Sequence, residues 1–161
     1  MYVLDANVFI TSKNTHYGFD FAPGFWDWID RAHSDGAICS LDKIKDELDA
    51  VQDELTAWAA ARVQLFLPMD QATVASITLL ATWVNASNYR PAAKATFLAS
   101  ADHQLIAFAH AHNHSVVTHE LSEPQNRRKI KIPDACAQMG VPCATLFDVL
   151  RADKAKLILE P

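Results

Sequence analysis

Short apolar runs alternate along this chain with longer helical patterns, and this alternation constrains the fold more than any other feature. The runs predict strands over residues 2–4, 37–39, 63–67, 115–117 and 143–146. Between them, the apolar spacing predicts helices over residues 25–31, 41–51, 54–61, 72–84, 92–110 and 134–139. Because strands that alternate with helices usually pair in parallel, the pattern predicts a three-layer α/β/α domain with a central parallel sheet of about five strands.

Local signals mark where some of these helices begin and end. Ser40 follows a predicted strand and precedes the apolar positions of residues 41–51, so we expect it to cap that helix. Gly36 and Gly140 lie where helices would stop. The chain of 161 residues has no internal repeat or linker, which predicts a single domain.

The charge balance limits the kinds of partner that the chain could bind. Its 14 Lys and Arg residues stand against 19 Asp and Glu residues, giving a formal net charge of -5. No general basic field is present to attract nucleic acid. A polyanion would therefore have to bind through a local basic patch or a metal ion.

The chain shows no sign of a membrane segment or of a disulfide framework. No stretch approaches the roughly 18 apolar residues that a membrane span needs, and the first residues lack a signal-peptide pattern, so we expect a cytoplasmic protein with no membrane partner. Cys39, Cys136 and Cys143 are odd in number and lack C-x-x-C spacing. They are predicted to be buried small apolar side chains and not zinc ligands.

Histidine and tryptophan invite functional interpretations that the spacing does not favour. His110, His112 and His114 alternate near a helix end and cannot share one helical face, which predicts a polar helix terminus. His103 and His119 adjoin candidate acids and are predicted to be solvated. The tryptophans fall on helix patterns and are predicted to pack in the core or at a partner interface, these being Trp26, Trp28, Trp58 and Trp83.

Acidic side chains stand at unusual places in the pattern. Asp5 ends the first apolar run, where a buried strand of an open α/β sheet would emerge into a ligand-binding crevice. Glu47, Asp102 and Glu120 are distant in sequence, yet each lies beside an apolar stripe or just past an apolar run. Four converging carboxylates would form a site for a hard divalent cation such as Mg²⁺ or Mn²⁺.

Each acid also has a structural interpretation. Asp5 is equally consistent with a turn former or an N-cap. Asp102 lies on an apolar stripe, four residues after Leu98, so an ionised carboxylate there needs a cation, a hydrogen-bond cage or a raised pKa. A buried salt bridge with Lys94 or an arginine would satisfy it, and Glu120 would fit an ordinary polar loop.

The strongest basic feature is the segment from residue 127 to residue 131. It contains Arg127, Arg128, Lys129 and Lys131, and it lies between Glu120 and another acid, Asp134. We expect these four side chains to contact phosphates beside the acidic pocket. The alternative is a solvated loop.

Four motifs give the chain a family resemblance. The segments VLDANVFI (3–10), KIKDEL (43–48), SADHQLIAFA (100–109) and VVTHE (116–120) resemble, in order and spacing, the motifs of PIN-domain ribonucleases. The segments FDFAPGFWDW (19–28) and KIPDAC (131–136) are similar to a small bacterial subgroup of PIN-like proteins of undefined function. The resemblance to VapC-type toxins is more distant.

The resemblance implies roles for particular residues. Asp5, Glu47 and Asp102 match the three acidic metal ligands of the family. Glu120 matches the fourth acid, which is usually Asp in a T-x-D arrangement. The chain therefore departs from the family pattern at the position of a second metal ion, where its side chain is longer. Asp134 is a competing fourth acid or an addition to Glu120. Asn7 and Thr118 are expected on the substrate side of the pocket.

These expectations combine into one predicted function. By resemblance the chain is a Mg²⁺- or Mn²⁺-dependent endoribonuclease and the toxin of a toxin-antitoxin pair, with RNA as substrate and an antitoxin and a second copy as partners. The alternative is a catalytically silent PIN-like module that binds RNA or protein. A phosphatase of the haloacid-dehalogenase type fits less well, because its motif has a second Asp where this chain has Asn7.

Overall fold

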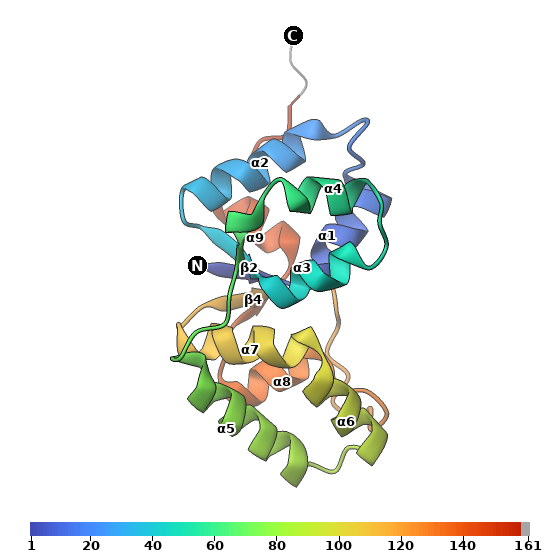
Figure 1. Cartoon of the computed structure of the whole chain (residues 1–161), viewed down its shortest axis with the longest axis vertical. Helices are drawn as coiled ribbons and strands as arrows, with labels where there is room; N and C mark the ends of the chain where they lie inside the picture. The colour runs from blue at the N-terminus through green and yellow to red at the C-terminus, as the bar shows by residue number, and fades with distance from the viewer. Residues whose placement is uncertain (159–161) are drawn as a thin grey trace.

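The computed structural model describes residues 1–158 and contains a five-stranded parallel sheet within them (Figure 1). The sheet order is β3-β2-β1-β4-β5, and every neighbouring pair is parallel. The strands are β1 (Tyr2–Leu4), β2 (Ile38–Leu41), β3 (Phe66–Leu67), β4 (Ser115–Val117) and β5 (Cys143–Ala144). The predicted fold class is therefore confirmed.

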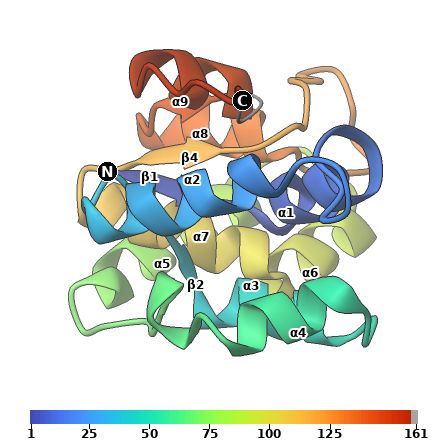
Figure 2. The ribbon, with the colours of Figure 1, turned by 90° about the horizontal axis from the view of Figure 1, so that it is seen from above.

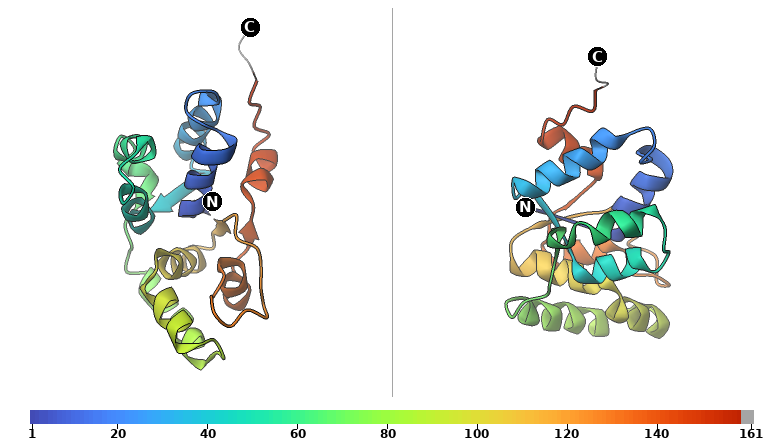
Figure 3. Two further views of the ribbon diagram at one scale, coloured as in Figure 1. Left: turned by 90° about the vertical axis from the view of Figure 1, so that its right-hand side faces the viewer. Right: turned by 45° about the horizontal axis from the view of Figure 1, so that its top comes forward.

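Helices cover both faces of the sheet. They are α1 (Ala6–Thr11), α2 (Pro23–Ser34), α3 (Asp42–Asp49), α4 (Glu54–Ala60), α5 (Thr73–Ala86), α6 (Pro91–Ala99), α7 (Ala101–Ala111), α8 (Ile132–Met139) and α9 (Leu146–Ala152). In Figure 1, α1, α2, α4 and α9 lie above the strands and α5, α7 and α8 lie below. The left view of Figure 3 shows the same layers from the side, with the blue α1 and α2 above and the yellow-green α5 below.

The direction of the chain across the sheet changes at β1. The connections from β1 to β2 and from β2 to β3 run toward one edge, whereas β4 and β5 lie on the other side of β1. Figure 2 shows α3 and α4 beside β2, and α8 and α9 beside β4, at opposite ends of the sheet. In open α/β sheets, ligands bind outside the carboxyl ends of the strands at such a point of reversal, which here lies between β1 and β4.

Two observed strands are shorter than the sequence pattern predicts. The run 63–67 begins as a 3-10 turn at Val63–Leu65, and only Phe66–Leu67 pairs with β2. The run 143–146 ends at Ala144, because Thr145 caps α9 through a reciprocal contact with Asp148. A 3-10 turn thus replaces the first three residues of one apolar run, and a capping box replaces the end of the other.

The predicted N-cap at Ser40 is wrong. Ser40 belongs to β2, and its buried hydroxyl donates a hydrogen bond to the Leu4 carbonyl at 2.7 Å. Leu41 instead occupies the N-cap of α3, without a side-chain bond. The interpretation of the glycines is confirmed, because Gly36 follows α2 and Gly140 caps α8, both with positive φ (70° and 66°).

The predicted helix over 92–110 is in fact two helices. Ser100 lies between α6 and α7 in an extended conformation (φ -85°, ψ 161°), and its hydroxyl donates to the Phe97 carbonyl at 2.7 Å. A continuous helix would require helical backbone angles at this residue. The break makes Asp102 the second residue of α7. The pattern also did not predict α1 or α9.

The core confirms most of the apolar assignments. Trp26, Trp28 and Trp58 are buried, and Trp83 packs partly buried against the core and Tyr89. Cys39 and Cys136 are buried as predicted, but Cys143 is exposed on β5 at the edge of the sheet. Over residues 1–158, no helix is long and apolar enough to cross a membrane.

Two histidine predictions have different outcomes. His103 was expected to be solvated but is 6% exposed, because it lies on the face of α7 that packs against Phe97. The polar helix terminus is confirmed. His110 in the last turn of α7 shares a hydrogen bond with Ser76 at 2.8 Å, and His112 at the C-cap lies 2.9 Å from Asp70.

Candidate functional site

The ends of β1 and β4 are joined by a small hydrogen-bond network. The Thr118 hydroxyl donates to Asp5 Oδ2 at 2.9 Å and accepts from Asn7 Nδ2 and the Glu120 amide, each at 3.1 Å. Asn7 Oδ1 accepts from the His119 amide at 3.0 Å. Thr118 is only 2% exposed. Its hydroxyl is therefore used within the protein, where it fixes the orientation of the Asp5 carboxylate.

Asp5 is buried at this junction with acidic neighbours. It follows β1 directly and is 3% exposed. Burial, repulsion from Asp102 and a smaller repulsion from Glu120 raise the pKa of Asp5 to about 7, against the opposing hydrogen bonds from Thr118 and the Ala6 amide. Asp5 occupies the N-cap position of α1 without a side-chain capping bond. The capping interpretation thus does not account for its carboxylate.

Asp102 approaches Asp5 and Glu120 from α7. It lies in the first turn of α7, where the helix dipole favours a carboxylate. Even so, burial, followed by repulsion from Glu120 and Glu47, raises the pKa of Asp102 to about 6, and Lys129 opposes the shift. The alternative interpretation of Asp102, a salt bridge with Lys94, does not hold. That ammonium donates to the carbonyls of Asn85 and Ser87, which end α5.

Glu47 lies at the rim of the group. It projects from α3, and its side chain is exposed. Partial loss of water contact raises the pKa of Glu47, while the Ala101 amide at the start of α7 lowers it. Glu47 therefore faces the N-terminus of the helix that carries Asp102, which brings carboxylates from α3 and α7 together.

Glu120 differs from the other acids because it has cationic partners. Its Oε1 pairs with the Lys129 ammonium, and Lys131 lies 3.9 Å from the same oxygen. Its Oε2 accepts from the Ile132 amide at 2.9 Å, at the start of α8. The side chain is 13% exposed. Both carboxylate oxygens are thus held by the basic segment and by α8.

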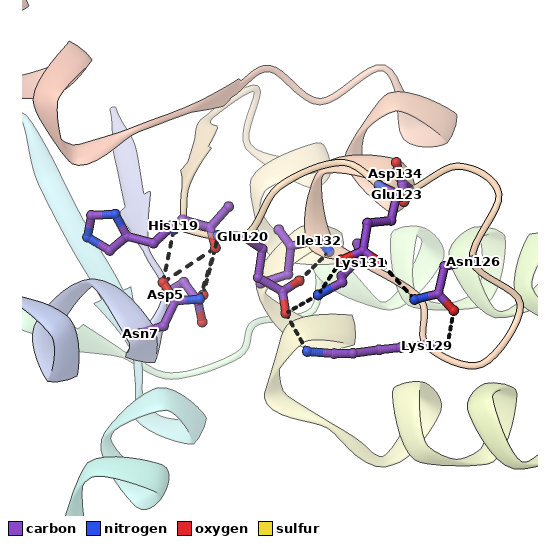
Figure 4. A network of polar contacts seen from close by, with 11 residues as sticks. Asp5, Asn7, His119, Glu120, Glu123, Asn126, Lys129, Lys131, Ile132 and Asp134 are labelled. Atoms are coloured by element: carbon purple, nitrogen blue, oxygen red, sulfur yellow. Dashed lines mark hydrogen bonds and ion pairs between the residues drawn. The ribbon is translucent and has the colours of Figure 1, made fainter.

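Asp134 is not brought into this group. Its carboxylate accepts hydrogen bonds from the Ser122 hydroxyl and, at 3.0 Å, from the Glu123 amide. Figure 4 shows it on the far side of the loop from Asp5. Among the candidates for the fourth acid, Glu120 is the one that acts electrostatically on Asp5 and Asp102.

The basic segment divides into two parts. Lys129 and Lys131 face acids, and Lys131 also pairs with Glu123 at 3.2 Å. Arg127 turns away, because its Nη1 donates to the Pro124 carbonyl and its guanidinium lies 5.5 Å from the Tyr89 ring centroid. Arg128 lines a cavity of about 160 Å³ together with Lys129 and Asp102. Two residues of the basic segment and one acid of the group thus line the same cavity.

The donor atoms of the acidic group suit a hard divalent cation, although the carboxylates do not surround a common point. Asp5, Glu47 and Asp102 offer only carboxylate oxygens, the ligands that Mg²⁺ and Mn²⁺ prefer. Two of these carboxylates have pKa values raised partly by repulsion from other acids of the group. Within residues 1–158, however, no three acidic, His or Cys side chains stand close enough together to form a ready-made cage. The residue types fit a cation that keeps several water ligands.

Sequence reasoning missed two features of the site. The first is the pairing of Lys129 with Glu120, nine residues apart in a loop without periodicity. The second is the role of the Thr118 hydroxyl in holding Asp5 across two strands. The T-x-E spacing carries a signal for the second, because it places a hydroxyl at the end of β4 beside β1.

The sheet order, parallel pairing and layers define this chain as a three-layer α/β/α domain with a PIN-like fold. The chain belongs to the DUF4411 family, a domain of unknown function, whose profile matches residues 2–157. A search of curated protein sequences gives no significant match.

Two solved structures match this chain at low sequence identity. A crystal structure of VapBC2 from Rickettsia felis bound to a DNA fragment from their promoter matches with a TM-score of 0.57 and 12% identity, over 89% of this chain and 97% of that chain. A structure of FitAB bound to an IR36 DNA fragment matches with a TM-score of 0.48 and 15% identity, over 90% and 94%. The first of these likenesses supports the fold assignment.

Proposed function

We propose that this protein is a divalent-metal-dependent nuclease that hydrolyses phosphodiesters in RNA. The observation that carries the proposal is Asp5, a carboxylate 3% exposed at the switch point of the sheet, which is repelled by Asp102 and Glu120. Burying such a charge without a cation is unfavourable, and structural needs alone do not require it here. Perturbed carboxylates in a crevice are typical of functional sites.

Each residue of the group has a proposed role. Asp5 and Asp102 would hold a Mg²⁺ or Mn²⁺ ion, with Glu47 reaching it through water from the rim. When bound, such an ion supplies an activated water and neutralises charge on the phosphate. Thr118 and Asn7 would position Asp5, since their polar atoms are occupied within the protein. Arg128, at the cavity that includes Asp102, would contact a substrate phosphate.

We also propose that the protein acts as the toxin of a toxin-antitoxin pair. Support comes from the motif resemblance to VapC-type toxins and from the shared fold with the VapBC2 structure. The partner would be an antitoxin protein, and a second copy of the chain is a further expected partner. A shared fold does not fix function, so this part of the proposal depends on the resemblance.

A second candidate function is a silent module that binds RNA or protein without cleaving it. One observation favours it: both oxygens of Glu120, the fourth acid, are occupied by Lys129 and the Ile132 amide. Under this alternative the basic segment would bind phosphates while the acids served only folding.

A cleavage assay separates the two candidates. Purified protein is incubated with fluorescently labelled single-stranded and structured RNAs in Mg²⁺ or Mn²⁺, with EDTA as the metal-free control. We expect cleavage that Asp5→Asn or Asp102→Asn abolishes, because each substitution removes one ligand charge with little change in volume. Asp20→Asn, which alters an exposed loop carboxylate, is the matched control and should retain activity. Metal-independent RNA binding without any cleavage would favour the silent module.

A further inference from the structure

The acids of the site fall into two sets according to their counter-charges. Among the described residues, Asp5, Glu47 and Asp102 have no ion pair with Lys, Arg or His, whereas Glu120 pairs with Lys129. Figure 4 shows Lys129 extending from its loop toward Glu120, on the side of the site away from His119. One part of the site thus lacks a cation, and the other already contains one.

Lys129 is placed to act on more than Glu120. Its pKa is raised first by the contact with Glu120 and then by the fields of Asp102 and Asp5, so the ammonium interacts electrostatically with all three of these acids. Its side chain is nevertheless 56% exposed. It lines the same cavity as Asp102 and Arg128. A phosphodiester entering this cavity could therefore touch the Lys129 ammonium directly.

We propose that Lys129 provides the second positive charge of the active site, so that the acidic group binds one divalent cation and Lys129 contacts the scissile phosphodiester opposite it. The inference rests on the proposed nuclease function and specifies how the site meets its substrate. A lysine is a compact point charge with three donors, which suits one phosphate oxygen and one Glu120 oxygen at the same time.

Glu120 has a defined task in this arrangement. Its side chain reaches the Ile132 amide and the Lys129 ammonium at once, so it anchors the basic segment to α8 and holds Lys129 over the cavity. Lys131 lies farther from Glu120, at 3.9 Å, and is shared with Glu123. Lys129 is accordingly the ammonium group committed to the site.

The test counts bound ions. Mn²⁺ is titrated into the metal-free full chain by calorimetry and by electron paramagnetic resonance of free Mn²⁺. We expect one ion per wild-type chain and two per Lys129→Met chain, because loss of the ammonium frees a Glu120 oxygen and removes a competing positive charge. Lys43→Met is the matched control, since Lys43 is similarly exposed and pairs with Asp46 on α3. It should bind one ion.

Activity provides the second readout. With RNA and Mg²⁺, Lys129→Met should lower kcat roughly 100-fold, in the range for loss of one charge-stabilising group, and Lys129→Arg should retain most of it. High Mn²⁺ should partly restore Lys129→Met and leave the wild type unchanged.

The inference is overturned if the wild type binds two Mn²⁺ ions, or if Lys129→Met binds one ion and keeps an unaltered kcat. If the wild type binds two ions and cleaves RNA, the nuclease proposal stands and the role of Lys129 falls. If the wild type neither binds Mn²⁺ nor cleaves RNA, both proposals fail. The wild-type ion count remains decisive even if Lys129→Met does not fold.

Discussion

The substitution Asp5→Asn should stabilise the metal-free protein at alkaline pH, although it removes a residue placed in the site. The pKa of Asp5 is raised from 3.8 to about 7, so the folded state binds a proton more tightly than the unfolded chain. The contribution of this group to stability is fully present below about pH 4 and is lost as the pH rises to about 7. Above pH 7 the folded protein carries a buried, repelled carboxylate.

The size of the effect follows from the shift. Roughly three pH units at about 1.36 kcal/mol each give an upper bound of about 4 kcal/mol. Because Asp102 shares the repulsion and the site relaxes, we expect about 2–4 kcal/mol in the free energy of unfolding at pH 8. For a chain of this length that corresponds to a rise in Tm of roughly 5–15 °C.

The assay is thermal unfolding in EDTA at constant ionic strength between pH 4.5 and pH 8.5. Groups that do not interact with Asp5 affect both proteins equally, so the difference between variant and wild type reports Asp5 and its repulsion from Asp102. That difference should be only about a quarter of its full value at pH 4.5, just above the unfolded pKa of 3.8, and should reach its full value by pH 8. Asn at this position can still accept the Thr118 hydrogen bond. Asp20→Asn, the exposed control, should change stability by less than about 0.5 kcal/mol at every pH.

Two results would refute this reasoning. If Asp5→Asn were less stable than the wild type at pH 8, the ionised carboxylate would have a stabilising partner that the described contacts lack. A difference that did not vary with pH would show that Asp5 has an ordinary pKa. In either case the carboxylates would not repel one another in the folded protein, and the strongest argument for a cation would be lost.

Four further predictions test other features of the site and the fold. Mg²⁺ at 100 times its Kd should stabilise the wild type by about 2.7 kcal/mol at pH 8 and should leave the Tm of Asp102→Asn almost unchanged. Thr118→Val should cost about 1–3 kcal/mol in urea unfolding, because the hydroxyl has three partners, and it should raise the pKa of Asp5 measured by carboxyl-carbon NMR. Glu120→Gln should lower the pKa of Asp102 in the same NMR titration. An unchanged pKa would show that Glu120 does not repel Asp102. Gly140→Ala should cost about 1 kcal/mol in thermal unfolding, since φ is 66° there, whereas Gly24→Ala near the start of α2 should cost less.

The fold could be predicted because its main signal is local. Strands β1 and β4 are short apolar runs, and their residue ranges match the pattern because no competing interaction changes them. Ser40 was misassigned because a hydroxyl after a strand fits both an N-cap and a cross-strand bond. Its actual partner, the Leu4 carbonyl, is 36 residues away. The sequence carries no sign of that contact.

The sequence pattern pointed to the acids of the candidate site, but it did not show which cations would lie beside them. Carboxylates at strand ends and on apolar helix faces are visible as breaks in a periodic pattern, which is how Asp5 and Asp102 stand out. The partner of Glu120 depends on the path of a loop without periodicity, so the pairing with Lys129 could not be read from spacing. The path of the same loop also turns Arg127 away from the acids and onto Tyr89, which spacing could not show either.

The break between α6 and α7 explains why the acidic group can exist at all. In a continuous helix, Asp102 would be a mid-helix carboxylate, whereas the extended Ser100 places it in a first turn. A helix N-terminus favours a carboxylate by about 0.3–1 kcal/mol. The pKa of Asp102 is nevertheless raised from 3.8 to about 6, which corresponds to roughly 3 kcal/mol in the opposite direction. Burial and the neighbouring acids therefore outweigh the helix, and the group that would reverse this balance is a cation bound between Asp5 and Asp102.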